Sequence, residues 1–398
     1  MKTNVAVVFG GRSVEHEIAI ISAVQAMASM DREKYEIYPV YMNKNGVFYS
    51  GEALFDIDTF RHAEKITALC DRVALVAGDG DGRAKIEYLK GGLFRKKAVS
   101  IDVCFPIVHG TNCEDGSVQG FFETIGVPYV GCDVMSSAIG MDKALFKNVL
   151  HDCGLPVLPA VVFGARYFSA ERDKALEKIK EKIGFPAIVK PANLGSSVGI
   201  SKVCDENELI AALNLAFSFS DRVLVEHAID SLREINCSVL GDRNDCEASA
   251  LEEPVMHDKI LSYDDKYRTN AKSSGSKGMA SLSRKLPADL PEEKAEEIKK
   301  IAVETFRCIG AAGVVRIDFL MDTADNDKVY VNEINTIPGS LAFYLWEAAG
   351  VKYPELIDRM IALAFKRQRE RENLMFTLDT NILNESSFGT KGSKGKIG

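Results

Sequence analysis

The chain has 398 residues, of which 46% are apolar and 27% charged, a composition typical of a globular protein of two to three domains. Lys and Arg total 49 against 57 Asp and Glu, and the net charge of −8 argues against sequence-independent nucleic-acid binding, which needs a basic surface. No apolar run reaches the roughly 18 residues of a membrane helix, so we expect neither a nucleic-acid nor a membrane partner.

The first elements alternate between strands and helices. Asn4–Phe9 is a continuous apolar, β-branched run, which predicts a buried parallel strand. A Gly-Gly turn then leads into a helix whose N-cap we assign to Ser13. Tyr35–Tyr41 and Ile101–Val108 are the next strands, and 77–92, rich in Gly, Asp and Lys, predicts a surface hairpin or loop. This order indicates a doubly wound α/β domain.

The middle of the chain predicts a small α+β domain with an antiparallel sheet. Its expected helices cover 136–153, 171–182 and 208–217. Its expected strands cover 186–190, 199–203 and 222–226.

The last third begins with a polar, lysine-rich segment, Ser262–Lys285, that we interpret as a long functional loop. A helix over Glu292–Cys308 follows. Val314–Leu320 and Lys328–Asn335 are expected strands joined by an Asp/Asn-rich turn. The Gly/Ser/Lys-rich residues 376–398 indicate a disordered tail.

These last two strands carry the most informative residues. Arg316 and Asp318 are two positions apart and share one strand face, as do Glu333 and Asn335 on the next strand. An antiparallel pairing brings an arginine, two carboxylates and an amide together, while apolar residues fill the opposite face: Val315, Ile317, Phe319 and Ile334. Oxygen ligands of this kind suit Mg²⁺ bound together with substrate phosphates. A solvent-facing, salt-bridged hairpin is the alternative.

Three loops follow predicted strands and carry polar residues. The loop 190–199, KPANLGSSVG, offers a lysine and exposed backbone N–H groups that suit phosphate oxygens, although it is not a Walker A motif. The segment 109–120, HGTNCEDGSVQG, follows a strand end, where α/β proteins bind ligands. The turn 10–17, GGRSVEHE, lacks the G-x-G-x-x-G pattern, which weakens a nicotinamide-dependent oxidoreductase as an alternative.

Taken together, the motifs closely resemble those of the D-alanine–D-alanine ligases, members of the ATP-grasp superfamily. Seven matches occur in family order: G-G-R-S-x-E-x-E (10–17), H-G-x-x-x-E-D-G-x-x-Q-G (109–120), M-D-K (141–143), K-P-x-x-x-G-S-S-x-G (190–199), D-K-Y (265–267), R-x-D-F (316–319) and N-E-I-N-T-x-P-G (332–339). The resemblance implies an ATP-grasp fold of mixed α/β and α+β type, in which a doubly wound N-terminal α/β domain precedes two α+β domains that clamp ATP.

The resemblance also implies an ATP site. Phosphate contacts would come from three lysines and two serines: Lys143, Lys190, Lys266, Ser196 and Ser197. The adenine pocket would be lined by Glu226, Ala228 and Ile229, and the ribose would be reached by Glu234. Asp318, Glu333 and Asn335 would hold two Mg²⁺ ions, with Mn²⁺ as an alternative metal.

The implied reaction joins two D-alanines through a D-alanyl phosphate, for peptidoglycan and cell-wall synthesis. Glu15 would hold the ammonium group of the first D-amino acid, and His109 would lie near its carboxylate. Arg316 and the Gly339 N–H would form an oxyanion site. Tyr267, on the predicted loop, would hydrogen-bond with Ser196 and Glu15. Tyr344 and Leu345 would contact the second amino acid.

Two positions depart clearly from the family pattern, and the loop sequence 276–290, SKGMASLSRKLPADL, is atypical as well. Cys113 replaces a usual glycine, which is tolerable unless that position needs a positive φ. Over Pro338–Glu347 the chain reads PGSLAFYLWE where the family usually has P-G-x-T-x-x-S-L/M-x-P, and Tyr344 stands in place of a serine. The acceptor is therefore open: D-serine or another amine, or a different acid in the first position, are the alternatives. Tyr267 favours an amine over a hydroxy acid.

The domains are predicted as 1–131, 132–226 and 227–370, with a tail over 371–398. We expect a cytoplasmic homodimer acting on small molecules. The nine cysteines are scattered without a C-x-x-C pair, which predicts reduced, buried thiols and no zinc site. The first apolar stretch is too short for a signal peptide. An ATP-binding regulatory protein without catalysis is a further alternative, but such a protein would be expected to lack Arg316 or a metal ligand.

Overall fold

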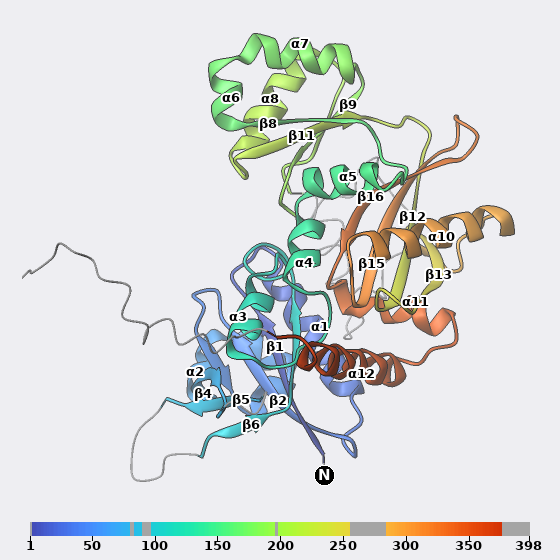
Figure 1. Ribbon diagram of the computed structural model, residues 1–398. Coiled ribbons are helices and arrows are strands. Elements are labelled where there is room, and N and C mark those ends of the chain that lie inside the picture. The colour runs from blue at the N-terminus through green and yellow to red at the C-terminus, as the bar shows by residue number, and fades with distance from the viewer. Residues whose placement is uncertain (1, 80–82, 90–96, 196–197, 255–283, 376–398) are drawn as a thin grey trace, which may run out of the picture.

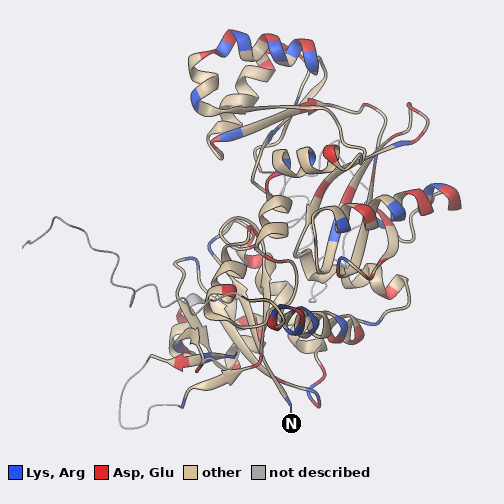
Figure 2. Cartoon of the chain, in the orientation of Figure 1, with Lys and Arg blue, Asp and Glu red and all other residues tan. Residues whose placement is uncertain are grey.

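Three β-sheets organise the chain in a computed structural model that describes residues 2–79, 83–89, 97–195, 198–254 and 284–375 (Figure 1). Residues 262–283 of the predicted loop lie outside the described part of the chain, and so do residues 376–398 of the predicted tail. Within the described residues, no helix is both long and apolar enough to cross a membrane. Charged residues are frequent along outer helices of the molecule, among them α7, α10 and α12 (Figure 2).

The first sheet has seven strands in the order β6-β5-β4-β3-β2-β1-β7. Its parallel part consists of β1 (Thr3–Gly10), β2 (Tyr35–Met42) and β7 (Val103–Val108), as expected. The sequence did not predict the full antiparallel extension by β3 (Phe48–Ser50), β4 (Asp71–Ala77), β5 (Ala84–Tyr88) and β6 (Val99–Ile101). The hairpin expected within 77–92 corresponds to the antiparallel pair of β4 and β5.

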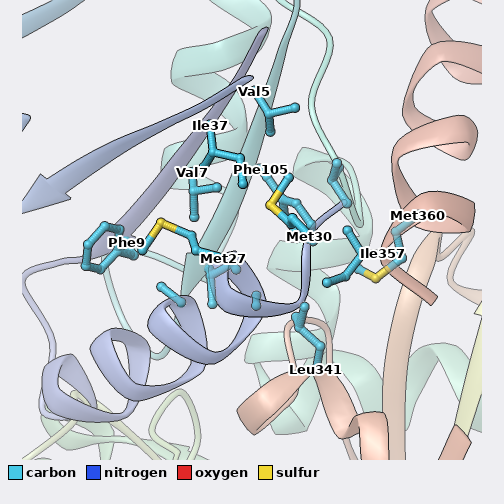
Figure 3. Close-up of a cluster of buried hydrophobic side chains, with 14 of the residues drawn as sticks. Val5, Val7, Phe9, Met27, Met30, Ile37, Phe105, Leu341, Ile357 and Met360 are labelled. Carbon is cyan, nitrogen blue, oxygen red and sulfur yellow. The ribbon is translucent and has the colours of Figure 1, made fainter. Parts of the chain in front are cut away.

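Helices cover both faces of this sheet. Helix α3 (Ser117–Ile125) packs on one face, and α1 (His16–Ser29) and α12 (Tyr353–Glu372) pack on the other. Figure 3 shows Ile357 and Met360 of α12 beside Met30, which follows α1, and Leu341, so α12 completes the first core. Helix α12 was not predicted, and it continues two residues into the expected tail.

The predicted N-cap of α1 is wrong. Glu15 occupies the N-cap position, and its side chain makes no capping hydrogen bond. The Ser13 hydroxyl instead donates to the backbone oxygen of His109, at 2.6 Å, and accepts from the N–H of Glu15. The side chain of Ser13 therefore joins the turn after β1 to the loop after β7.

The second sheet is antiparallel, as expected, in the order β10-β9-β11-β8. Its strands are β8 (Ala160–Gly164), β9 (Ala187–Pro191), β10 (Ser201–Val203) and β11 (Arg222–His227). Its helices are α6 (Ala165–Ala170), α7 (Arg172–Lys182) and α8 (Glu206–Phe217).

The single helix expected over 136–153 is two helices, α4 (Val134–Met141) and α5 (Lys143–Asp152). They divide at Asp142, whose backbone is extended and whose carboxylate accepts from the N–H groups of Ala144 and Leu145. An N-cap of this kind ends one helix and begins the next, and it places Lys143 at the first position of α5.

The third sheet is antiparallel, in the order β14-β13-β12-β15-β16. Its strands are β12 (Leu232–Gly241), β13 (Cys246–Pro254), β14 (Arg284–Lys285), β15 (Gly313–Asp322) and β16 (Lys328–Asn335). Helix α10 (Glu292–Cys308) covers its apolar face. After β16 the chain passes through a short turn, η4 (Gly339–Ala342), into α11 (Phe343–Ala348). The domain boundaries named above remain predictions.

The expectation that every cysteine is reduced is wrong for one pair. Cys153, at the end of α5, and Cys308, at the end of α10, form a disulfide. The other seven cysteines are free, and most of them are buried. Because 155 residues separate Cys153 from Cys308, no local spacing pattern signals the pair.

Candidate functional site

A row of polar side chains crosses the face of the third sheet that is opposite helix α10. The strand register places Glu252 opposite Asn236, Asn236 opposite Asp318, and Asp318 opposite Glu333. Arg316 and Asn335 form the adjacent pair one step along β15 and β16. The expected division of this hairpin into a polar and an apolar face is confirmed, since the four apolar residues of the opposite face are buried in the core under α10: Val315, Ile317, Phe319 and Ile334.

Arg316 and Asp318 form a two-point ion pair within this row. The Arg316 Nε donates to Asp318 Oδ1 at 2.6 Å, and a terminal guanidinium nitrogen donates to Oδ2 at 2.8 Å. Burial alone would lower the pKa of Arg316, but the Asp318 carboxylate outweighs this effect and the pKa lies above its usual range. Asn335 Nδ2 also donates to Asp318, at 3.2 Å. The site therefore holds a permanent, oriented positive charge.

A pocket joins this row to the first half of the chain. It is lined by residues of the turn before α1, the loop after β7, α4, α5, the Gly-rich loop and β16: Glu15, Glu114, Gly140, Met141, Lys143, Gly195, Glu333, Ile334, Asn335 and Thr336. Lys143 donates to the backbone oxygen of Leu194 at 2.7 Å, and its Nζ lies 3.2 Å from Glu333 Oε2. Three segments far apart in sequence thus meet at one ammonium group.

A second cluster of charges lies at the second sheet. The buried carboxylate of Glu226 pairs with Lys190 on one oxygen and with Lys147 on the other, where the distance is 2.9 Å. Burial opposes ionisation of Glu226, but the two ammonium groups outweigh it and lower its pKa to about 2. Lys190 also donates to Asn332 Oδ1 at 3.0 Å. No motif drew attention to Lys147, although it lies one helical turn after Lys143 and shares its face.

Glu15 and His109 lie where the first sheet meets the pocket. A Cβ atom on Gly110 would lie 2.6 Å from Glu15 Oε2, and one on Gly195 would lie 2.9 Å from it, so two glycines make room for this carboxylate. His109 is buried, and its Nε2 lies 3.2 Å from the Ser22 hydroxyl. Burial lowers the pKa of His109 to about 4, and the charge of Arg316 adds to that effect. His109 is therefore neutral near pH 7.

Glu114 is the residue of this pocket whose role the sequence did not reveal. Its carboxylate is buried and accepts from the Ile337 N–H at 2.7 Å, the Thr336 hydroxyl at 3.3 Å and the Gly110 N–H at 3.3 Å. One carboxylate thus bridges the loop after β7 and the turn after β16. Burial, together with the nearby charge of Glu15, raises the pKa of Glu114 to about 7.

Cys113, the first departure from the family pattern, is accommodated. The positive φ angles in its loop fall on Gly110, Asn112 and Gly116, and not on Cys113. The buried Cys113 side chain lies over Gly11, where a Cβ atom would come within 2.2 Å of Cys113 Sγ. The cysteine therefore depends on the absence of a side chain at Gly11.

The second departure, 338–347, forms η4 and α11. Three consecutive residues of η4 have positive φ near 50°: Ser340, Leu341 and Ala342. The Ser340 N–H donates to the Ser22 hydroxyl at 2.9 Å, which ties this turn to α1 beside His109. Gly339 is the first residue of η4. Tyr344 and Leu345 lie in α11 and are buried.

Several expected site residues lie outside the described part of the chain, namely Ser196, Ser197, Lys266 and Tyr267. Ala228 is buried and donates its N–H to the backbone oxygen of Pro186, with Ile229 directly after it. Glu234 lies on β12, two residues before Asn236, and therefore on the same sheet face as the polar row.

The donor set of the polar row fits a hard cation. Asp318 and Glu333 are cross-strand neighbours, and the Asn335 amide lies beside them. One or two carboxylates plus substrate phosphates are the usual protein environment of Mg²⁺. In the part of the chain that the structure describes, no cluster of three His, Cys, Asp or Glu residues forms a metal site by itself, so phosphate oxygens would have to complete the coordination.

Comparison with known proteins points to one family. Residues 4–132 match the model of the D-ala D-ala ligase N-terminus, and residues 149–362 match that of the D-ala D-ala ligase C-terminus. The chain is 38% identical over 380 residues to a D-alanine–D-alanine ligase of Thermosipho melanesiensis, covering 96% of this chain and 98% of the relative. It is 39% identical over 375 residues to one of a Thermoanaerobacter species, covering 93% and 98%.

Solved structures agree with the sequence comparisons. The fold is similar to that of the D-alanine-D-alanine ligase from Coxiella burnetii, with a TM-score of 0.76 and 31% identity over 93% of this chain and 96% of the other. It is also similar to that of the VanG D-Ala:D-Ser ligase from Enterococcus faecalis, with a TM-score of 0.75 and 28% identity over 92% and 100%.

Proposed function

The chain belongs to the D-alanine–D-alanine ligase family, and from that premise we propose how its residues divide the work of the reaction. It is an ATP-dependent ligase that joins two D-alanines for cell-wall synthesis. The observation that carries the assignment of roles is the convergence of Glu15, Lys143 and the Glu333–Asn335 end of the polar row on one pocket.

The chemistry explains why such a pocket is needed. A carboxylate reacts poorly with an amine, so the first D-alanine must be activated by transfer of the γ-phosphoryl group of ATP, which gives an acyl phosphate and ADP. The amine of the second D-alanine then attacks the carbonyl carbon, and phosphate leaves. Catalysis of phosphoryl transfer is mainly positioning and charge stabilisation. The oriented guanidinium of Arg316 and the N–H of Gly339 are our candidates for stabilising the tetrahedral oxyanion.

Lysines on two elements are our candidates for binding the phosphates of ATP. Lys143 and Lys190 approach from α5 and β9, and each is held by a carboxylate of the site. Ser196, Ser197 and Lys266 would add to them. Ala228, Ile229 and Glu234 would line the nucleoside site. Glu226 would act there chiefly through Lys190, because both of its oxygens face ammonium groups.

We propose that Asp318, Glu333 and Asn335 hold two Mg²⁺ ions, or Mn²⁺ in their place. The ions would supply positive charge to the phosphate oxygens during transfer. The pairing of Arg316 with Asp318 fits this arrangement, since a carboxylate has about four lone-pair sites and can accept from a guanidinium while it binds a cation.

Glu15 and His109 are our candidates for binding the first D-alanine, through its ammonium and carboxylate groups respectively. A neutral His109 would act there as a hydrogen-bonding group and not as a charge. Tyr267 would complete a hydrogen-bonded group with Ser196 and Glu15. The second amino acid would lie beside Arg316, Tyr344 and Leu345. D-serine is the alternative acceptor, which the similarity to a D-Ala:D-Ser ligase favours as a second candidate.

The test is phosphate release with ATP, Mg²⁺ and D-alanine alone, followed by mass spectrometry of the product. We expect D-alanyl-D-alanine. Absence of turnover with D-alanine in the first position would refute the assignment. Addition of D-serine separates the two acceptors, because the mixed dipeptide has a different mass. We also propose a homodimer in the cytoplasm, and sedimentation velocity would test the oligomeric state.

A further inference from the structure

A buried cluster closes one end of the polar row. Glu252, on β13, is 3% exposed and accepts three hydrogen bonds. Its donors are Asn236 Nδ2 at 3.0 Å, the Tyr344 hydroxyl at 3.0 Å and an Arg284 guanidinium nitrogen at 2.7 Å. The Arg284 guanidinium also lies 4.0 Å from the centre of the Tyr344 ring. The tyrosine is therefore fixed both at its hydroxyl and at one ring face.

The cluster stands next to the reacting end of the site. Trp346, two residues after Tyr344, donates to the Ser238 hydroxyl at 2.9 Å, and Ser238 is the cross-strand neighbour of Arg316. Helix α11 is thus seated over the strand position beside Arg316. Asn236, which donates to Glu252, is the cross-strand neighbour of Asp318, and Asp318 pairs with Arg316. Arg316 is near enough to Tyr344 and Glu252 for both to influence its pKa, and near enough to His109 to lower the pKa of that imidazole. Arg316 therefore adjoins both the His109 side of the site and the Tyr344 side.

The cluster is rigid because displacing any member exposes a buried charge. Moving the Tyr344 ring would break its bond to Glu252 and uncover the Arg284–Glu252 ion pair, whose side chains are 10% and 4% exposed. Removing one partner of a buried pair is strongly unfavourable. A flexible apolar side chain could move aside for a larger ligand. The Tyr344 ring cannot do so easily, because Glu252 holds its hydroxyl and Arg284 holds one ring face.

We infer that Tyr344, held by Glu252 and Arg284, is a specificity-determining wall that limits the second substrate to a small D-amino acid, such as D-alanine or D-serine. The inference rests on the proposed function and deepens it by naming the acceptor class. The first D-amino acid would bind beside Glu15 and His109, so Tyr344 would not restrict its size.

The test compares acceptors of increasing size with D-alanine as the donor: D-alanine, D-serine, D-2-aminobutyrate and D-norvaline. Mixed dipeptides are separated by mass. We expect Tyr344→Ala to raise the kcat/KM ratio of D-norvaline over D-alanine at least about tenfold, since each methylene that finds a matching space is worth roughly that factor. The KM values for ATP and for the first D-alanine should stay unchanged. Tyr344→Phe should retain the exclusion, because the ring and its contact with Arg284 remain.

Phe343→Ala is the matched control. It removes a ring of similar size from the same helix, one that stacks on Tyr353 toward the first core, with ring centroids 4.6 Å apart, and meets Tyr344 edge-on at 6.1 Å. The control therefore separates the Tyr344 ring itself from the packing beside it. An acceptor ratio that changes equally in Tyr344→Ala and Phe343→Ala would overturn the inference. If Tyr344→Ala does not fold, Arg284→Leu keeps the ring and removes the guanidinium that holds it, and an unchanged ratio there would overturn the inference as well. A wild-type enzyme that makes no D-alanyl-D-alanine would instead refute the proposed function.

Discussion

Replacing Glu114 with glutamine tests whether the carboxylate that joins the loop after β7 to the turn after β16 has a pKa near neutrality. The side chain lies between the loop after β7 and the turn after β16, and the Ile337 N–H donates to it at 2.7 Å. Glutamine retains the size and one oxygen acceptor but does not ionise. The substitution therefore removes the titration while keeping most of the bridge.

The magnitude follows from the pKa of Glu114, which burial raises from 4.5 to about 7. Because the pKa is higher in the folded chain than in the unfolded chain, the contribution of Glu114 to stability is complete below pH about 4.5 and is lost as the pH rises through about 7. One pH unit corresponds to about 1.4 kcal/mol. Between pH about 5 and about 8.5, the free energy of unfolding of the wild type should therefore fall by about 2 to 3 kcal/mol relative to Glu114→Gln.

Urea unfolding of both proteins at several pH values measures this difference. Infrared difference spectra provide a direct check, since a protonated carboxyl band that is absent in Glu114→Gln should disappear with a midpoint near pH 7. A free-energy difference that stays constant across this range would refute the reasoning, because it would show that Glu114 titrates as an ordinary carboxyl group. Activity should depend on the bridge as well, with Glu114→Ala losing more kcat than Glu114→Gln.

Three further predictions concern other parts of the molecule. Arg316→Met should lower kcat about a hundredfold or more in steady-state assays, because the oriented charge beside the reacting carbonyl is lost; an unchanged kcat would remove Arg316 from the mechanism. Lys147→Met should raise the KM for ATP about tenfold and leave the KM for D-alanine unchanged. The reason is that Glu226 loses one of its two ammonium partners, which disturbs the carboxylate that orients Lys190. Equal effects on both KM values would contradict this role. Thiol titration of the unfolded, unreduced chain should count seven thiols, and a count of nine would show that Cys153 and Cys308 are not joined.

Local sequence patterns were sufficient for the parts of the site that depend on neighbouring residues. Arg316 and Asp318 alternate with buried apolar residues, and the two-residue period of a strand places both on one face whatever the rest of the chain does. The turn after Asp322 then fixes the antiparallel partner strand. The helix over Glu292–Cys308 was predicted at its observed limits, because its apolar residues recur at helical spacing between a proline and a glycine.

Long-range packing decided what the sequence did not reveal. Glu252, Arg284 and Tyr344 meet only because β13, β14 and α11 come together at one edge of the third sheet. The bridge at Glu114 spans more than two hundred positions, since its partner Ile337 is 223 residues away. Helix α12 has no motif of its own, and its apolar face is explained only by its packing against α1 and β7. Whether a segment forms a strand or a helix depends largely on residues close by in the chain. Buried ion pairs and shifted pKa values depend instead on segments far apart in sequence, which pack together and exclude water from the charged groups. By itself the sequence therefore determined the local elements and the chemical character of the polar hairpin, and only the tertiary structure decided which charges share its pocket.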